Sequence, residues 1–251
     1  MKRFFDISRF WMLLKLELFK SRKGILMTMV ISFGMLFFVG FLLSLYVEHP
    51  AIYDHTENYA YSLFLGGFIL SSLAFNELGG GLKRLRYLTI PVSTFERFLC
   101  MWMLTSIGWL VIYTLCFALY TMIANPVGQL IFANTTFKTF DPFGSFAITV
   151  MQYYFVLHGI FLLGAAHFRG YVFPKTMVVI ILILLVSVGL LYLFLKDEFL
   201  SDHYCTVEGE CELVDAFIVH PVGVMSKVLF WYVLAPLTWF LSYLGLKDQE
   251  A

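Results

Sequence analysis

Long apolar runs alternate with short polar segments along the whole chain. Each run has about 17 residues or more, which is enough for a helix to cross a hydrocarbon core about 30 Å thick. The pattern predicts an all-α integral membrane protein with six transmembrane helices. The expected spans are residues 24–47, 60–76, 98–124, 145–168, 176–195 and 221–246.

The segment that precedes the first run, residues 2–23, has its apolar side chains at helical spacing. A stripe of such residues opposite a charged face predicts an amphipathic helix that lies in the membrane interface. The alternative is that this segment simply extends the first span. Charged residues continue as far as Lys23, which is not typical of a cleavable signal peptide. The stripe consists of Phe4, Ile7, Trp11, Leu14 and Leu18.

Composition agrees with a membrane protein, because 60% of the residues are hydrophobic and only 14% are charged. Soluble domains have about 25% charged residues. No internal repeat or linker composition interrupts the chain, so residues 1–251 are interpreted as one transmembrane domain.

The basic residues are unevenly distributed. All Lys and Arg except Lys138, Lys196 and Lys227 fall in the amino-terminal segment, in residues 83–97, in residues 169–175 or in the carboxy-terminal tail. Cytoplasmic loops are enriched in Lys and Arg, so both termini are expected in the cytoplasm. No basic patch lies outside the membrane-flanking segments, and nucleic acid is therefore not an expected partner.

The second and third spans are joined by residues 78–97, the most basic internal segment of the chain. Pro91 interrupts it, and Ser93 is placed to cap a helix that begins at Thr94. Glu77 immediately precedes the segment and is expected to pair with a basic residue of it. The candidates for that pairing are Lys83, Arg84 and Arg97.

Small residues at helical spacing occur in the second span, where Ser62 is followed by Gly66, and Gly67 by Ser71. Such pairs let two helices approach closely. We interpret them as packing positions within the chain rather than as the lining of a substrate path.

The acidic residues 196–220 are expected outside the cell, where Cys205 and Cys211 can form a disulfide. Two free thiols, or a metal pair that includes His203, are the alternatives. Gln152 and His158 are polar residues within the fourth span and are candidates for a transport path. A hydrogen bond to a neighbouring helix would explain them equally well.

Motifs of catalysis are missing from the sequence, including GxSxG, HExxH and the phosphate-binding GxxxxGK[ST]. We therefore expect no enzymatic activity and no cofactor in this chain itself.

The layout resembles the membrane subunits of ABC type-2 transporters: an amphipathic amino-terminal helix, six spans, a basic segment between spans two and three, and a long external segment before span six. The stretch at 88–98, LTIPVSTFERF, is similar to the LPAS…EKF signature found there in many such permeases, notably from Bacteroidota. Val92 in place of Ala and Arg97 in place of Lys are departures from that signature.

The resemblance implies a permease that exports a substrate across the bacterial cytoplasmic membrane, as a homodimer or paired with a related permease. Two copies of a separate ATPase subunit would bind ATP and Mg, and the 78–97 segment would couple the permease to them. A non-transporting scaffold or sensor with the same body is the alternative. The implied ATPase-coupling residues are Lys83, Arg84, Arg86, Pro91, Ser93, Phe95, Glu96 and Arg97.

Overall fold

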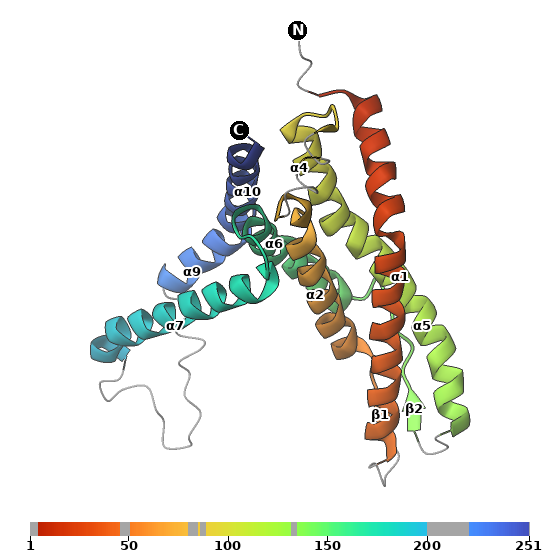
Figure 1. Cartoon of the computed structure of the whole chain (residues 1–251). Coiled ribbons are helices and arrows are strands. Elements are labelled where there is room, and N and C mark those ends of the chain that lie inside the picture. Colours follow the sequence, from red (N-terminus) through yellow and green to blue (C-terminus); the bar gives the residue numbers. More distant parts are fainter. Residues whose placement is uncertain are drawn as a thin grey trace.

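A computed structural model describes residues 5–45, 51–79, 85, 89–131, 135–199 and 221–250. Within these ranges most residues lie in long helices, and α1 begins and α10 ends at the same end of the molecule as the start of α4 (Figure 1). The α-helices are α1 (Ile7–Leu45), α2 (Thr56–Leu73), α4 (Thr94–Met103), α5 (Trp109–Ile131), α6 (Ser145–His167), α7 (Val172–Phe199), α9 (Pro221–Val228) and α10 (Ala235–Glu250).

Among the described residues, five helical segments are long and apolar enough to cross a membrane, and they correspond to the predicted second to sixth spans. This confirms a mainly helical chain with the character of a membrane protein. The five segments are Thr56–Leu78, Thr94–Ile131, Ser145–His167, Val172–Leu190 and Val224–Gln249.

The amino-terminal segment and the predicted first span form one continuous helix, α1, with no break at residue 24. A separate interfacial helix is therefore not observed, and the alternative of a simple extension describes α1 better. In the predicted apolar stripe only Leu14 is buried, whereas Ile7, Trp11 and Leu18 are exposed. The face of α1 that packs on the protein is a neighbouring one, made by Phe10, Leu13, Leu14 and Glu17, and Phe4 lies outside the described residues.

The third span is longer than predicted, because the helix that Ser93 caps is the start of the span itself. α4 continues into a π turn, η2 (Leu104–Gly108), and then into α5, which extends to Ile131. A π turn disturbs the regular hydrogen-bond ladder of a helix. Here the hydroxyl of Tyr154 on α6 donates to the Thr105 carbonyl over 2.6 Å, so this turn is fastened to a neighbouring helix.

Two of the segments between the predicted spans pair as short strands. β1 (Ala51–Tyr53) and β2 (Thr135–Phe137) form a parallel two-stranded sheet with Ile52 opposite Thr136. Next to it, Lys138 Nζ forms a 3.0 Å ion pair with Asp54. This sheet lies at the opposite end of the molecule from the start of α4 (Figure 1).

α2 and α6 pack closely, and the predicted small residues of α2 are used as packing positions. A Cβ atom on Gly67 would overlap the ring of Tyr154, and one on Gly66 would overlap Trp109 of α5. Phe68 stacks on Phe161 of α6 with ring centroids 4.1 Å apart. α2 therefore contacts both α5 and α6 through its small residues.

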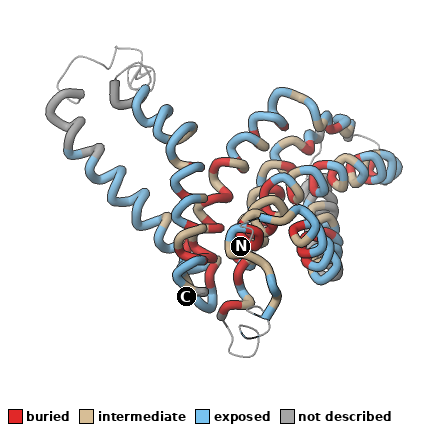
Figure 2. Tube along the Cα trace, turned by 90° about the horizontal axis from the view of Figure 1, so that it is seen from above, coloured by how far each residue is buried: buried red, intermediate tan, exposed pale blue. Residues whose placement is uncertain are grey.

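α7 and α9 diverge from the other helices, and residues 181–190 of α7 and 224–228 of α9 are exposed (Figures 1 and 2). The chain turns from α6 into α7 through Gly170 and Tyr171, which have φ of 61° and 51°. The predicted external segment, 196–220, begins within α7, and its residues from 200 onward lie outside the described ranges.

Candidate functional site

The start of α4 is held by a reciprocal pair of hydrogen bonds between Ser93 and Glu96. The backbone N–H of Glu96 donates to Ser93 Oγ over 3.2 Å, and the backbone N–H of Ser93 donates to Glu96 Oε2 over 2.8 Å. This capping box satisfies backbone donors that a helix end would otherwise leave unpaired. The predicted cap at Ser93 is thereby confirmed.

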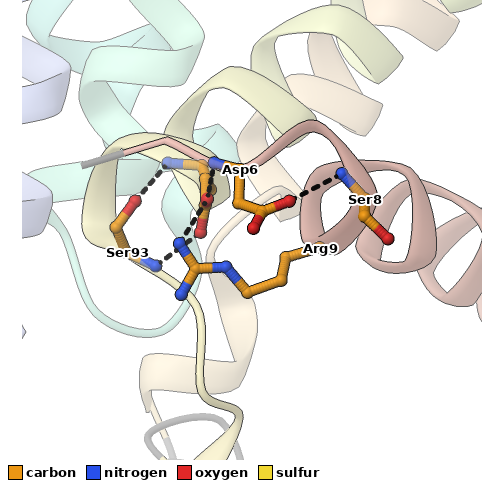
Figure 3. Close-up of polar contacts among 5 residues, drawn as sticks. Asp6, Ser8, Arg9 and Ser93 are labelled. Carbon is orange, nitrogen blue, oxygen red and sulfur yellow. Dashed lines mark hydrogen bonds and ion pairs between the residues drawn. The ribbon is translucent and has the colours of Figure 1, made fainter. Parts of the chain in front are cut away.

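The second oxygen of the same carboxylate attaches α4 to the start of α1. Glu96 Oε1 accepts a 2.7 Å hydrogen bond from the backbone N–H of Asp6 and a 3.1 Å ion pair from Arg9 Nη2. Figure 3 shows Asp6, Arg9 and Ser93 gathered around this group. Glu96 has no exposed surface, so one buried carboxylate joins the two helices.

The Arg97 side chain binds the backbone just before the Ser93 cap. Its Nη2 donates to the Ile90 carbonyl over 2.8 Å, and the side chain is buried. Glu77, which was expected to pair with Lys83, Arg84 or Arg97, forms an ion pair with Lys20 of α1, and Lys83 and Arg84 lie outside the described residues. Lys20 and Glu77 pair because, in the folded chain, α1 lies beside the end of α2 and brings Lys20 to Glu77.

Pro91 and Phe95 are exposed residues of the segment. Phe95 is 39% exposed, and its ring meets Phe5 edge-on at 6.3 Å and Tyr243 of α10 edge-on at 6.1 Å. Phe98, one turn further, also contacts Tyr243, at 5.9 Å. The surface around Phe95 is therefore supported by three helices: α1, α4 and α10.

The predicted coupling residues are thus divided between surface and interior. Pro91 and Phe95 are exposed, Ser93 is half-buried, and Glu96 and Arg97 are buried. The remaining three, Lys83, Arg84 and Arg86, lie outside the described residues.

Gln152 and His158, the candidate path residues, are not brought together. Gln152 is exposed, whereas His158 is fully buried and its Nδ1 lies 2.8 Å from the Phe155 carbonyl of the same helix. The two side chains therefore lie on different faces of α6. Cys205 and Cys211 lie outside the described residues, and in the described ranges no three His, Cys, Asp or Glu residues are grouped to hold a metal ion.

Asp6 and Arg9 were not recognised from the sequence as parts of this site. A signal for the buried role of Glu96 was present, because Ser93 and Glu96 have the S-x-x-E spacing of a capping box. No comparable local signal connects Arg9 to Glu96, which are 87 residues apart.

Comparisons of the chain with protein-family models, with curated proteins and with solved structures gave no significant match. The sequence resemblance and the geometry of the segment at residues 89–98 are therefore the indications of function.

Proposed function

We propose that this chain is the membrane-spanning permease subunit of an ABC-type exporter in the bacterial cytoplasmic membrane. Export would be driven by ATP hydrolysis, with Mg, in two copies of a separate ATPase subunit. The permease would act as a homodimer or together with a related permease. The observation that carries the proposal is the junction at residues 89–98, where an exposed surface is joined to three helices.

A transporter of this kind must convert movement of a cytoplasmic partner into movement of its spans. The Ser93–Glu96 capping box makes the start of α4 a defined helix end, and α4 continues directly into a membrane-spanning rod. Packed elements move as rigid bodies, so displacement at such an end is transmitted rather than absorbed. A partner that displaced Phe95 would therefore also displace α4.

The same displacement would reach two other helices. Glu96 is bonded to the start of α1 through Asp6 and Arg9, and Phe95 and Phe98 contact Tyr243 of α10. A partner bound at this surface would thus act together on α1, on the span formed by α4, η2 and α5, and on α10. That arrangement supports the coupling role implied by the resemblance to ABC type-2 permeases.

The proposal is tested with Phe95→Asp, which places a charge on the exposed coupling surface. Purified under mild detergent from its native membrane, the wild-type protein should carry a stoichiometric ATPase subunit with a phosphate-binding loop and measurable ATP hydrolysis. Phe95→Asp should remain in the membrane but lose that subunit and its activity. Phe143→Asp is the matched control, because Phe143 is 84% exposed and precedes α6, far in the chain from the junction.

Two outcomes would contradict the proposal. One is recovery of the wild-type protein without any nucleotide-binding partner, which would favour the scaffold or sensor alternative. The other is a well-expressed Phe95→Asp variant that keeps the ATPase subunit and full activity, which would remove the coupling role from this surface.

A further inference from the structure

A cavity of about 590 Å³ lies between α1, α2 and the rod formed by α4, η2 and α5. Cavities that hold small molecules in proteins usually have volumes of about 300–1,000 Å³. Three residues of the π turn, Leu104, Thr105 and Gly108, form part of its wall. Asp6, Arg9, Ser93, Phe95 and Glu96 do not line it, so it is a separate feature of the fold.

The cavity is elongated, and its polarity changes along its length. On α2 and the turn after it, the lining extends from Gly66 to Asn76, which corresponds to about 15 Å of helix axis. The far part is apolar and is lined by Leu70, Leu73, Leu104, Trp109 and Ile112. The near part is polar and is lined by Glu17, Lys20, Ser21, Asn76 and Glu77.

Among the described residues that line the polar part, Glu17 and Glu77 are negative and Lys20 is positive. Lys20 forms its ion pair with Glu77, and its Nζ is 4.0 Å from Glu17 Oε2, too far for a hydrogen bond. Glu17 is 9% exposed, and in the described part of the chain its carboxylate accepts no hydrogen bond. Buried carboxylates are normally paired or hydrogen-bonded. The Glu17 carboxylate therefore lies at the polar end of an apolar cavity with an ion-pair partner, Lys20, at 4.0 Å but with no hydrogen bond from that partner.

We propose that this cavity binds a single-chain amphiphile with a protonated amine headgroup. The ammonium group donates to Glu17, and the hydrocarbon tail lies along the apolar part beside Leu70 and Trp109. Leu18 and Leu73, on the rim, are exposed, so a tail can enter from the surrounding lipid. That such an amphiphile is also the exported substrate rests on the proposed function, whereas binding itself does not.

The test uses the purified full chain in phosphatidylcholine nanodiscs and radiolabelled dodecylammonium, with empty nanodiscs subtracted to correct for partitioning into lipid. Dodecanol and dodecyl sulfate have the same tail and serve as competitors. Dodecanol should compete about tenfold more weakly than unlabelled dodecylammonium, because it lacks the charge-assisted hydrogen bond. Dodecyl sulfate should be weaker still. Equal competition by the three compounds, or a preference for the sulfate, would overturn the proposal.

Two variants separate the headgroup contact from the tail contact. Glu17→Gln should abolish the preference for dodecylammonium over dodecanol and leave the affinity for dodecanol unchanged. Glu57→Gln is the matched control, because Glu57 is an exposed carboxylate in the first turn of α2 and does not line the cavity. Retention of the full ammonium preference by Glu17→Gln would contradict the assignment of Glu17.

Leu73→Trp provides a second measurement that does not depend on the folding of the Glu17 variant. Leu73 is 54% exposed, so the larger ring can be accommodated while it occupies the cavity. This variant should weaken dodecylammonium and dodecanol alike, and wild-type affinities would place the ligand elsewhere. The assay contains no ATPase, so failure of binding leaves the Phe95 experiment unaffected, and failure of that experiment leaves the cavity's ligand unaffected.

Discussion

Arg9 on α1 donates across 3.1 Å to the carboxylate of Glu96, which has no exposed surface. The same carboxylate accepts backbone N–H groups from Asp6 and Ser93, so both of its oxygens are satisfied. A buried charge is tolerated when it is paired and fully hydrogen-bonded in this way. Glu96 thereby fixes the start of α1 against the start of α4, at the surface that we propose faces the ATPase.

Replacement of Glu96 should therefore destabilise the whole chain and not only the proposed coupling surface. Glu96→Ala removes the capping box and leaves Arg9 and two backbone donors without their acceptor. We expect a loss of about 3 kcal/mol or more, measured as a lower thermal unfolding temperature in detergent. Glu57→Ala, at an exposed carboxylate, should unfold like the wild type. An Ala variant as stable as wild type would show that the network contributes little.

At Gly67, the space between α2 and α6 is too small for a side chain larger than hydrogen. A Cβ atom there would overlap Tyr154, whose ring is fully buried and whose hydroxyl is tied to the Thr105 carbonyl. Gly67→Ala should thus lower the unfolding temperature, since a packed core resists added volume at a cost of about 1–3 kcal/mol.

The matched control for this substitution is Gly34→Ala on α1, where an added Cβ meets no atom within 4 Å. Because Ala is favoured over Gly in a helix by about 1 kcal/mol, this variant should be as stable as the wild type or more stable. If Gly67→Ala and Gly34→Ala shifted the unfolding temperature equally, close packing of α2 on α6 would be contradicted.

His55 makes the stability of the chain depend on pH. Burial lowers the pKa of His55 below its usual 6.5, although the hydrogen bond with Asn125 acts in the opposite direction. As pH falls through 6.5, the unfolded chain takes up a proton at this site before the folded chain does, so folding stability decreases. The unfolding temperature should be lower at about pH 5.5 than at about pH 7.5.

His55→Gln should flatten this pH dependence, because Gln does not titrate and can still donate to Asn125. Asp54 does not interfere in the same window. Its pKa is lowered by the Thr56 hydroxyl and by Lys138, so its stabilising contribution is present above the usual 3.8 and is lost only at lower pH. An unchanged slope in His55→Gln would contradict the role of His55.

Ser93 shows how far local pattern can predict this fold. Its hydroxyl, its position after Pro91 and the Glu three residues later together specify a helix start, and they do so whatever the rest of the chain does. The apolar runs predicted spans two to six for the same reason, since span length is a property of one segment. These features were predicted from residues within a few turns of each other.

In contrast to the helix start at Ser93, the face of α1 that packs on the protein was not predicted by the local pattern. Its periodicity indicated a stripe through Ile7, Trp11 and Leu18 that would face the membrane interface, and these side chains are exposed on the protein, while a neighbouring face packs on Cys100 and its surroundings. Helical spacing defines which side chains share a face, whereas the position of the neighbouring helix decides which face is buried. In a chain that is apolar almost all round, the pattern cannot make that choice.

The sequence by itself determined the helical class of this protein, five of its candidate membrane spans, the helix start at Ser93 and the close-packing positions in α2. Each follows from the side chains of one short stretch. Tertiary structure alone decided that Glu96 meets Arg9, that Glu77 pairs with Lys20 and that Glu17 faces a cavity. These contacts join residues of α1 to distant parts of the chain, and they exist only because packing of the apolar helices brings those residues together.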